Sequence, residues 1–327
     1  MVLTIGNFDG VHRGHRALLD EGMTLARAAG AQLAVMTFEP HPAAVLSPDR
    51  VPARLTPLHE KLRLLAAAGA GVVVVVESRP EFFAISADDF IREVIVRRFH
   101  PVAMVEGDEF RFGRHRQGDV EMLRAAGRQH GFEVHTVEPV RAGLGGHPDT
   151  VISSSLVRHL LGSGNVDRAA ACLGRPYGLF GTVRRGAGRG RTLGFPTANL
   201  AVEDQLVPAE GVFAGLAHLG ARSASEGERG GGGEGETEGR RDGGTERGGA
   251  PLPAAISIGR TPTFAGHELL VEAHLLDFQG DLYDRSLRVD FLDWIRGQQK
   301  FASVDALKEQ IAQDVARVRE TTAAKAE

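Results

Sequence analysis

The sequence has few cysteines, no long apolar runs and little net charge, and each of these absences excludes a class of protein. It contains one cysteine, Cys172, in 327 residues, which excludes an internal disulfide framework and a cysteine-based zinc site. No apolar run reaches the roughly 20 residues that a membrane-spanning helix requires. The formal net charge is only −4, which argues against a general nucleic-acid-binding protein. What remains is an ordinary globular composition, with 42% hydrophobic and 24% charged residues.

The first residues also lack the basic region and apolar segment of a secretory signal peptide, so we predict a cytoplasmic protein. Neither a nucleic acid nor a membrane is an expected partner, and no obligate protein partner is indicated. The length favours two domains. Cys172 stands in an apolar helical context, where a buried structural thiol is expected.

Two histidines stand where a short strand passes into a helix. Residues 2–5 are typical of a buried strand, and leucine spacing indicates a helix from about Arg13. His12 and His15 are three residues apart, so both rings can face one side of the helix N-terminus. Free N–H groups and the helix dipole favour an anion there, and we predict a nucleoside triphosphate. The turn residues assigned to phosphate are Gly6, Asn7, Phe8, Asp9 and Gly14. A helix-capping turn with surface histidines is the alternative.

Strand and helix patterns alternate over the first half of the chain. Thr56–Pro57 predicts a capped helix start, with Leu58, Leu62 and Leu65 on one face. Five consecutive valines at 72–76 suit a parallel strand covered on both faces. The expected strands are 2–6, 32–37, 72–76, 102–106 and 133–137, and the expected helices are 13–28, 57–68, 87–98 and 119–130. This order predicts an α/β fold with an open, doubly wound parallel sheet, whose ligands bind outside the carboxyl ends of the strands.

The ten residues GNFDGVHRGH at 6–15 resemble the signature of the adenylyltransferase module of prokaryotic bifunctional riboflavin kinase/FAD synthetases. The resemblance implies a nucleotidyltransferase domain that moves AMP from ATP to FMN. No protein nucleophile is implied, because the terminal phosphate of FMN attacks the α-phosphorus of ATP and pyrophosphate leaves. Catalysis would then be positioning and charge stabilisation, helped by Mg²⁺.

Two loops of the first half extend this resemblance. The loop at 37–42 follows the second expected strand, in a region that the family uses near the flavin. Residues 107–113 look like the family's G-x-D-F-R-F-G segment, in which Asp108 would hold the nucleotide and two phenylalanines would form an apolar wall. The residues assigned to flavin are Phe38, Pro40, Phe110 and Phe112. The alternative is that both phenylalanines of the second loop are core residues and Asp108 caps a turn.

Residues 151–158 match the family's I-S-S-T-x-I-R element. Its hydroxyls open a helix and would hold phosphate oxygens, while Arg158, one turn on, would take charge from the pyrophosphate. A plain serine cap is compatible with this role. The hydroxyl residues are Ser153, Ser154 and Ser155, and the expected catalytic residues of this half are His12, His15 and Arg158.

The pattern changes near residue 174, where long helices stop and short β-type runs begin. These runs predict a small antiparallel β-barrel, followed by a C-terminal helix that begins near Ser303 and frays over 321–327. The expected strands are 178–184, 212–219, 253–258, 269–276 and 287–292. We therefore predict two domains, residues 1–173 and 174–327.

A glycine loop at 186–192 precedes the second motif. It is not a Walker loop, because Arg191 stands at the lysine position, but such loops can cover phosphates. Residues 190–200 resemble the riboflavin kinase signature, whose core is P-T-A-N. The resemblance implies that Thr197 and Asn199 hold Mg²⁺ and the ATP phosphates. The loop glycines assigned to ATP are Gly186, Gly188 and Gly190. An ordinary turn and edge strand is the alternative.

Glu272 lies in a segment, 271–283, that is similar to the family's E-x-H-L-L-D-F-x-G-D-L-Y. The resemblance implies that Glu272 is the general base, which takes the proton from the ribityl hydroxyl as that oxygen attacks the γ-phosphorus. A surface-facing strand glutamate is the commoner explanation for a residue of this kind. Residues 257–264 match a further family segment, I-G-x-x-P-T-F.

Residues 221–250 interrupt the barrel. They hold eleven glycines and twelve charged residues, with no large apolar side chain, so we predict a disordered surface insert. A regulatory or partner-binding insert is the alternative.

The motifs together predict an enzyme that phosphorylates riboflavin to FMN and then adenylylates FMN to FAD. Its expected substrates are riboflavin, FMN and ATP, with Mg²⁺ needed in both steps. One rival is a riboflavin kinase whose first domain is inactive or weakened. The other is a flavin-binding or regulatory protein without turnover.

Overall fold

The structure is a computed structural model that describes residues 1–144, 147–186, 190, 194–222, 250–263 and 266–325. The chain forms two compact units. The first comprises Met1–Arg158 and Cys172–Gly174, and the second comprises His159–Ala171 and Arg175–Glu327. Among the described residues, no helix combines the length and apolar character that crossing a bilayer requires.

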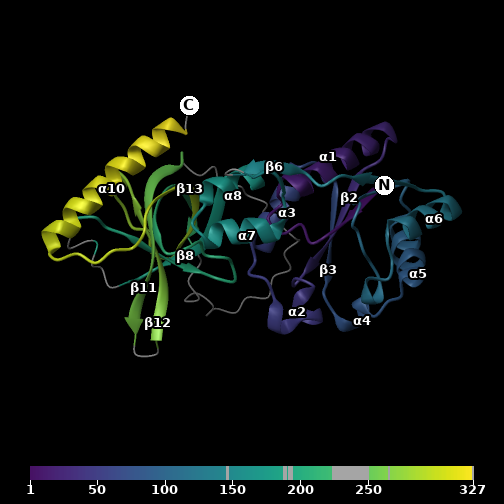
Figure 1. The fold of residues 1–327 in the computed structure, drawn as a ribbon, viewed down its shortest axis with the longest axis horizontal. Coiled ribbons are helices and arrows are strands. Elements are labelled where there is room, and N and C mark those ends of the chain that lie inside the picture. The colour runs from purple at the N-terminus through teal and green to yellow at the C-terminus, as the bar shows by residue number, and fades with distance from the viewer. Residues whose placement is uncertain (145–146, 187–189, 191–193, 223–249, 264–265, 326–327) are drawn as a thin grey trace, which may run out of the picture. The chain divides into compact units, whose positions relative to one another are not determined.

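The first unit is built on a five-stranded sheet with the order β3-β2-β1-β4-β5 (Figure 1). Every neighbouring pair is parallel, so the predicted doubly wound sheet is confirmed. The strands are β1 (Val2–Ile5), β2 (Leu33–Glu39), β3 (Val72–Glu77), β4 (Ala103–Gly107) and β5 (Glu133–Val137). The longer helices are α1 (Arg13–Ala28), α3 (Leu58–Ala67), a π-helix at Phe90–Phe99 that continues α5 (Ala87–Asp89), and α6 (Val120–His130). Shorter elements are α2 (Ala43–Leu46), α4 (Pro80–Phe83), 3₁₀ turns at Pro48–Arg50 and Arg114–Arg116, and the hairpin of β6 (Arg141–Leu144) and β7 (His147–Val151).

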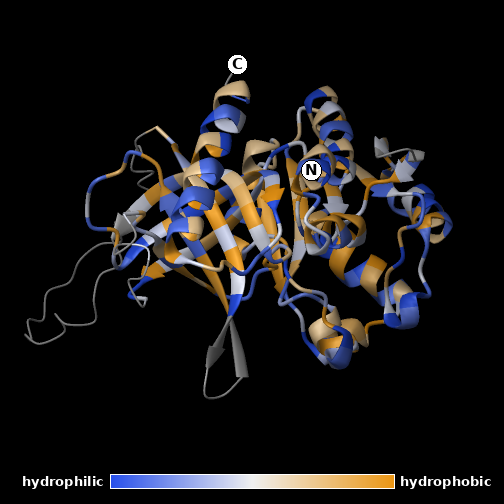
Figure 2. Cartoon of the chain, turned by 60° about the vertical axis from the view of Figure 1, so that its left-hand side comes forward, coloured by the Kyte–Doolittle hydropathy of each residue, from blue (hydrophilic) through white to orange (hydrophobic). Residues whose placement is uncertain are grey.

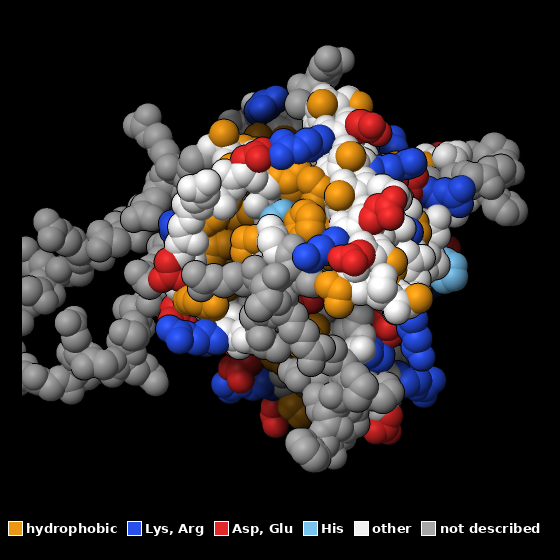
Figure 3. Space-filling view, turned by 90° about the vertical axis from the view of Figure 1, so that its left-hand side faces the viewer, with side chains coloured by type: hydrophobic (Ala, Val, Ile, Leu, Met, Phe, Trp, Pro, Cys, Tyr) orange, Lys and Arg blue, Asp and Glu red, His pale blue; other side chains and the backbone are white. Residues whose placement is uncertain are grey.

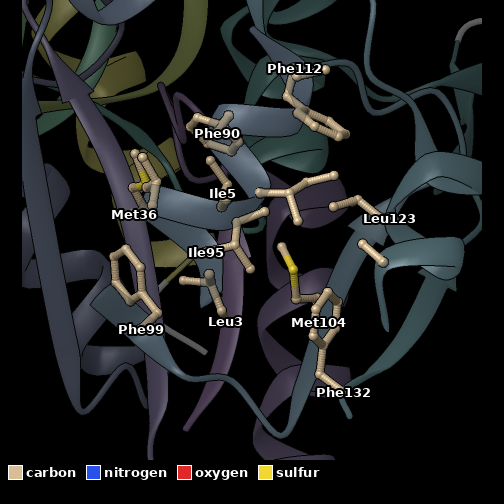
Figure 4. Close-up of a cluster of buried hydrophobic side chains, with 14 of the residues drawn as sticks. Leu3, Ile5, Met36, Phe90, Ile95, Phe99, Met104, Phe112, Leu123 and Phe132 are labelled. Atoms are coloured by element: carbon tan, nitrogen blue, oxygen red, sulfur yellow. The ribbon is translucent and has the colours of Figure 1, made fainter. Parts of the chain in front are cut away.

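Side-chain alternation along the strands gives the sheet a core on each face. Leu3, Ile5 and Met104 pack with Phe90 and Leu123 on one face, as Figure 4 shows. Their strand neighbours, including Val2 and Leu33, pack on the other face against Leu19 of α1 and Leu64 of α3. Both faces of the central strands are therefore covered, as a parallel sheet requires.

The valine run at 72–76 forms the parallel strand that was predicted, but at an edge of the sheet. Val72, Val74 and Val76 pack against one core cluster and Val73 against the other, so both faces are covered. Val75 is nevertheless 37% exposed. The edge position was not foreseen, because strand composition does not specify the position of a strand within its sheet.

The start of α3 also differs from the prediction. Pro57 is the N-cap residue and makes no side-chain cap, whereas the Thr56 hydroxyl accepts a hydrogen bond from the Gly10 backbone N–H at 3.1 Å. The buried residues of this helix are Glu60, Lys61, Leu64 and Leu65, so of the leucines chosen from the spacing only Leu65 is buried. Tertiary contacts to the Gly6–His15 turn thus take the place of a local cap.

The boundary between β1 and β4 is the switch point of the sheet, because the strand order reverses direction there. The β1–β4 register joins Val2 to Ala103 and Leu3 to Met104. Two residues further, the Ile5 N–H donates to the side-chain Oε1 of Glu106 at 2.9 Å. Glu106 is 1% exposed, and burial raises the pKa of its carboxyl group well above the usual range. A buried carboxyl group whose protonated form is favoured therefore lies next to the residue that precedes the Gly6–His15 turn.

This group predicts a pH-dependent stability of the first unit. Glu106 keeps its proton to a higher pH in the folded protein than in the unfolded chain, so the folded state loses relative stability as pH rises above the unfolded pKa of about 4.3. Glu106→Gln removes this titration and keeps an oxygen acceptor for Ile5. We measure the unfolding temperature by calorimetry from acidic to mildly alkaline pH. As pH rises, the unfolding temperature of the variant should increase relative to that of wild type by several degrees, since 1 kcal/mol corresponds to roughly 3 °C. The exposed Glu109→Gln should show no such trend, and a pH-independent gap for Glu106→Gln would contradict the prediction.

The second unit contains a closed antiparallel barrel with the order β10-β11-β12-β9-β8-β13. Its strands are β8 (Tyr177–Arg184), β9 (Ala198–Val202), β10 (Gly211–Arg222), β11 (Leu252–Thr263), β12 (Gly266–Leu275) and β13 (Arg285–Arg296). The predicted barrel is confirmed, although β9 was not foreseen. Phe213 packs edge-on against both Phe291 and Trp294 within it. Bands of hydrophobic residues run along the barrel strands in Figure 2, and Figure 3 shows hydrophobic side chains gathered between charged ones on the side facing the viewer.

Three helices complete the second unit or lead into it: α7 (Ser154–Gly162), α8 (Val166–Leu173) and α10 (Val304–Ala324). The Ser303 hydroxyl caps α10 by accepting from the Ala306 N–H at 3.1 Å. Val318 of this helix packs with Ala214 and Leu276 of the barrel unit. The predicted fraying from residue 321 is wrong, because Thr322 is buried and its hydroxyl donates to the Val318 carbonyl at 2.8 Å.

The predicted insert at 221–250 begins two residues too early, because β10 continues to Arg222. Most of the predicted insert, residues 223–249, lies outside the described residues.

Candidate active sites

The Gly6–His15 turn is held by a buried carboxylate. Asp9 is 5% exposed, and its oxygens accept the backbone N–H groups of Leu55 and Thr56 at 3.0–3.1 Å. The backbone is tightly curved, with positive φ angles of 49° at Phe8 and 38° at Val11. The carboxylate oxygens of Asp9, which was predicted to contact phosphate, thus accept hydrogen bonds from the protein's own backbone and stabilise the turn.

The two histidines lie together at the start of α1. The His12 Nδ1 accepts the His15 N–H at 3.3 Å and caps the helix. Their ring centroids are 3.6 Å apart with an interplanar angle of 17°, so the predicted placement of both rings on one side is confirmed. A Cβ atom at Gly14 would lie 3.1 Å from the His12 ring, which explains why the smallest residue stands between the histidines. The capping interpretation also holds for His12.

His15 is the more available of the two rings. Its Nδ1 is buried and makes no hydrogen bond within the described part of the chain. Burial lowers the pKa of His15 well below its usual range, and the nearby His12 and Lys61 lower it further. The neutral form of His15 is therefore favoured in the free protein, and one of its ring nitrogens is buried without a partner in the described residues.

The serine element reaches the same turn from far along the chain. The Ser154 hydroxyl donates to the Asp9 carbonyl at 2.8 Å, and the Ser153 hydroxyl accepts the Leu156 N–H at 3.2 Å as a helix cap. The Arg158 guanidinium forms an ion pair with the Asp9 carboxylate and donates to the Ala53 carbonyl at 2.7 Å. Ser155 is exposed. Arg158 is thus anchored beside the histidine turn rather than extended into solvent.

His41 is a residue of this site that the sequence analysis did not single out. Its Nδ1 accepts the Ala43 N–H at 3.1 Å, and its Nε2 lies 3.3 Å from the Asn7 side-chain amide. Because Nδ1 accepts a hydrogen bond, Nε2 carries the proton in the neutral ring. We therefore assign the Asn7 side chain with its amide oxygen, the acceptor, toward Nε2. Burial lowers the pKa of His41, which favours this neutral form. The Asn7 NH₂ group is then free to face the other side of the turn.

The residues predicted near the flavin lie at the carboxyl ends of β2 and β4. Phe112 is 6% exposed and belongs to the core cluster, as the alternative interpretation held. Phe110 is partly buried and stacks on it at a centroid distance of 5.7 Å. Phe38 is partly buried against the same cluster, whereas Pro40 and Asp108 are exposed. Of the three phenylalanines assigned to the flavin, Phe38 and Phe110 thus keep part of their surface accessible at this edge of the sheet, and Phe112 does not.

The second site is in the barrel, where three predicted residues meet. Asn199 of β9 is paired directly with Glu272 of β12. The Thr197 hydroxyl, just before β9, lies 3.3 Å from Glu272 Oε1. These side chains offer hydroxyl, amide and carboxylate oxygens, which are the hard ligands that Mg²⁺ prefers. The donor set therefore fits a magnesium–phosphate group.

Two described glycines of the glycine loop lie against Asn199 and Thr197. A Cβ atom at Gly186 would lie 2.2 Å from the Asn199 amide, and one at Gly190 would lie 3.1 Å from the Thr197 hydroxyl. The close approach explains the glycines at these two positions; Gly188 lies outside the described residues. Thr197 also lines a cavity of about 640 Å³, together with Arg185 and Tyr283 at its edge. The threonine is thus open to a space that can hold a ligand.

The first unit is a doubly wound sheet with the histidine turn at its switch point. The second is a barrel in which hydroxyl, amide and carboxylate side chains meet, with Thr197 at a cavity. This combination is typical of a two-unit nucleotide-dependent transferase. Residues 1–155 match the family model of FAD synthetase, and residues 173–322 match that of riboflavin kinase. The chain belongs to the bifunctional riboflavin kinase/FMN adenylyltransferase family.

Individual relatives support this over nearly the whole chain. The bifunctional riboflavin kinase/FMN adenylyltransferase of Escherichia coli K12 is 40% identical over 98% of this chain and 92% of its own length. The protein of the same name from Haemophilus influenzae is 35% identical, over 96% and 91%. A crystal structure from Streptococcus pneumoniae, described as a macrolide-efflux protein, has a TM-score of 0.81 at 29% identity and covers 97% of this chain and 93% of its own.

Proposed function

We propose that this chain makes FMN from riboflavin and ATP in its second unit, and FAD from FMN and ATP in its first. The single observation that carries the proposal is that each unit has both its own family match and an assembled cluster of the residues expected for its step. We assign residues 1–173 to the adenylyltransferase domain and 174–327 to the kinase domain. The substrates are small molecules, and the proposed location is the cytoplasm.

In the adenylyltransferase step, a terminal phosphate oxygen of FMN attacks the α-phosphorus of ATP and pyrophosphate leaves. The protein supplies position and charge. The half-buried His15 ring lies at the turn with His12 stacked against it, and a ring N–H of His15 would donate to a phosphate oxygen. Arg158 lies beside the turn as a fixed positive charge, with Asp9 orienting it. Phe38 and Phe110 offer partly buried apolar surface for a flavin ring.

In the kinase step, the ribityl hydroxyl attacks the γ-phosphorus of ATP and ADP leaves. Glu272 accepts the hydroxyl proton, and the hydrogen bond from Thr197 orients its carboxylate. Thr197 and Asn199 would hold Mg²⁺, which neutralises phosphate charge when bound. The glycines of the loop let its backbone approach the phosphates, as their packing on Asn199 and Thr197 supports.

Incubation of the protein with riboflavin, ATP and Mg²⁺, followed by chromatographic separation of the flavins, tests the proposal. FMN should appear first and FAD later, and FMN supplied directly should yield FAD. Chelation of Mg²⁺ should stop both steps, because the phosphate charge is no longer neutralised. FMN without FAD would mean an inactive first unit, and neither product would mean a flavin-binding protein without turnover.

A further inference from the structure

Lys61 is a buried cation close to the histidine turn, and nothing in the sequence motifs accounts for it. It lies on α3 and is 5% exposed, although a buried lysine is rare unless it has partners. The spacing of leucines placed Leu58, Leu62 and Leu65 on one face of this helix and did not single out Lys61. The contacts of its ammonium group account for its burial.

The contacts of the Lys61 ammonium group join the carboxyl ends of two neighbouring strands. Its Nζ lies 3.2 Å from the Phe38 carbonyl of β2 and 3.4 Å from the Asn7 carbonyl just after β1. The Thr37 hydroxyl lies 3.5 Å away and itself donates to the Asn7 carbonyl at 3.0 Å. Two donors thus fix the orientation of one peptide group at the start of the turn.

That orientation has a consequence for phosphate binding. The carbonyl of a trans peptide and the following N–H point in opposite directions. With the Asn7 carbonyl held toward Lys61, the Phe8 N–H is directed away from it. A turn that begins in this way offers a backbone donor to an anion on its outer side.

The charge of Lys61 is only loosely compensated. The nearest carboxylate is Glu39, whose Oε2 is 3.8 Å from Nζ, while its Oε1 forms an ion pair with Arg54. Burial lowers the pKa of Lys61, whereas Glu39 and Asp9 act in the opposite sense. Lys61 in turn lowers the pKa of His15 and of His41. The other charged or titratable groups that act on this cluster are His12, Arg54 and Arg158.

We propose that Lys61 is a positioning residue of the adenylyltransferase site, which holds the phosphate-binding turn in its anion-accepting form and places a buried positive charge behind it. Lys61 acts through Asn7 and the histidines and does not itself touch the substrate. The inference rests on the proposed adenylyltransferase function of the first unit.

Lys61→Met, which keeps the length and removes the charge, is the test, with Lys61→Arg as the conservative variant and the exposed Lys308→Met as the matched control. We expect Lys61→Met to lower kcat/KM for FMN adenylylation about 10- to 100-fold, with riboflavin kinase activity unchanged in the same chain. Lys61→Arg should recover a large part of the loss, and Lys308→Met should match wild type. The His15 ring signal, assigned by its absence from His15→Ala, should titrate at higher pH in Lys61→Met.

Unchanged adenylylation and an unchanged His15 titration in Lys61→Met would overturn the proposal. It would also be overturned if Lys61→Met and Lys61→Arg lost activity equally, in proportion to a lowered unfolding temperature of the first unit, since that result describes packing alone. If wild type itself made FMN but no FAD, the proposed function would fail, and the His15 titration would still decide whether Lys61 acts on the turn.

Discussion

His15→Ala is expected to lower the rate of FAD formation by about 10²–10³-fold, the effect of removing one preorganised group that meets transition-state charge. The reason is that His15 alone of the paired rings has a buried nitrogen with no partner in the described residues. Truncation orphans no hydrogen bond of its side chain, so folding should suffer little. The packing that is lost is the stack on the His12 ring, at a centroid distance of 3.6 Å, and the contact with the Phe8 ring, at 5.1 Å. FAD is measured from FMN and ATP, and FMN from riboflavin in a parallel reaction.

The parallel reaction is the internal standard, because the kinase residues belong to the other unit. His130→Ala, at an exposed position on α6, is the matched control and should leave both rates unchanged. A His15→Ala protein that makes FAD at the wild-type rate would show that the stacked histidines serve only to cap α1.

Glu272→Gln is expected to lower riboflavin phosphorylation by about 10²–10⁴-fold, the usual contribution of a positioned general base. Glutamine has the same shape and still offers an oxygen to the Thr197 hydroxyl, which lies 3.3 Å from the carboxylate. What it loses is the capacity to take the proton of the attacking hydroxyl. The measurement is the initial rate of FMN formation, with FMN adenylylation as the standard that should not change.

Glu203→Gln is a suitable control, because Glu203 is exposed and follows β9 closely. The rival interpretation, a strand glutamate that merely faces the surface, predicts equal kinase rates for the two variants. If Glu272→Gln retains full kinase activity, the general base must be another residue of the barrel unit.

The fold was predictable where local patterns are strong. Every strand of the first sheet and five of the six barrel strands were foreseen near their observed places, because each carries a run of β-forming residues between turn signals. β9 was missed because its five residues, ANLAV, begin two positions after Pro196 and show no clear alternation of apolar and polar residues. The edge position of β3 depends on strand order, which no local pattern records.

The sites were predictable only where their parts are neighbours in sequence or in a motif. His12 and His15 lie on one helix turn, so their stacking follows from spacing. The Asp9–Arg158 pair joins residues 149 positions apart, and no local pattern indicates it. Lys61 had the appearance of a helix-surface lysine, because its burial is created by β1 and β2 rather than by α3 itself. The pKa shifts of His15 and Glu106 likewise come from tertiary burial.

The two units differ in whether their sheets have edge strands. The barrel closes on itself, whereas the parallel sheet ends in β3, a strand of five valines with an unpaired side. Unpaired N–H and C=O groups on an apolar, β-forming segment are a template for pairing with another chain. Self-association on heating or partial opening should therefore start from the first unit, and a charged residue in place of Val75, which is already 37% exposed, is the natural way to suppress it.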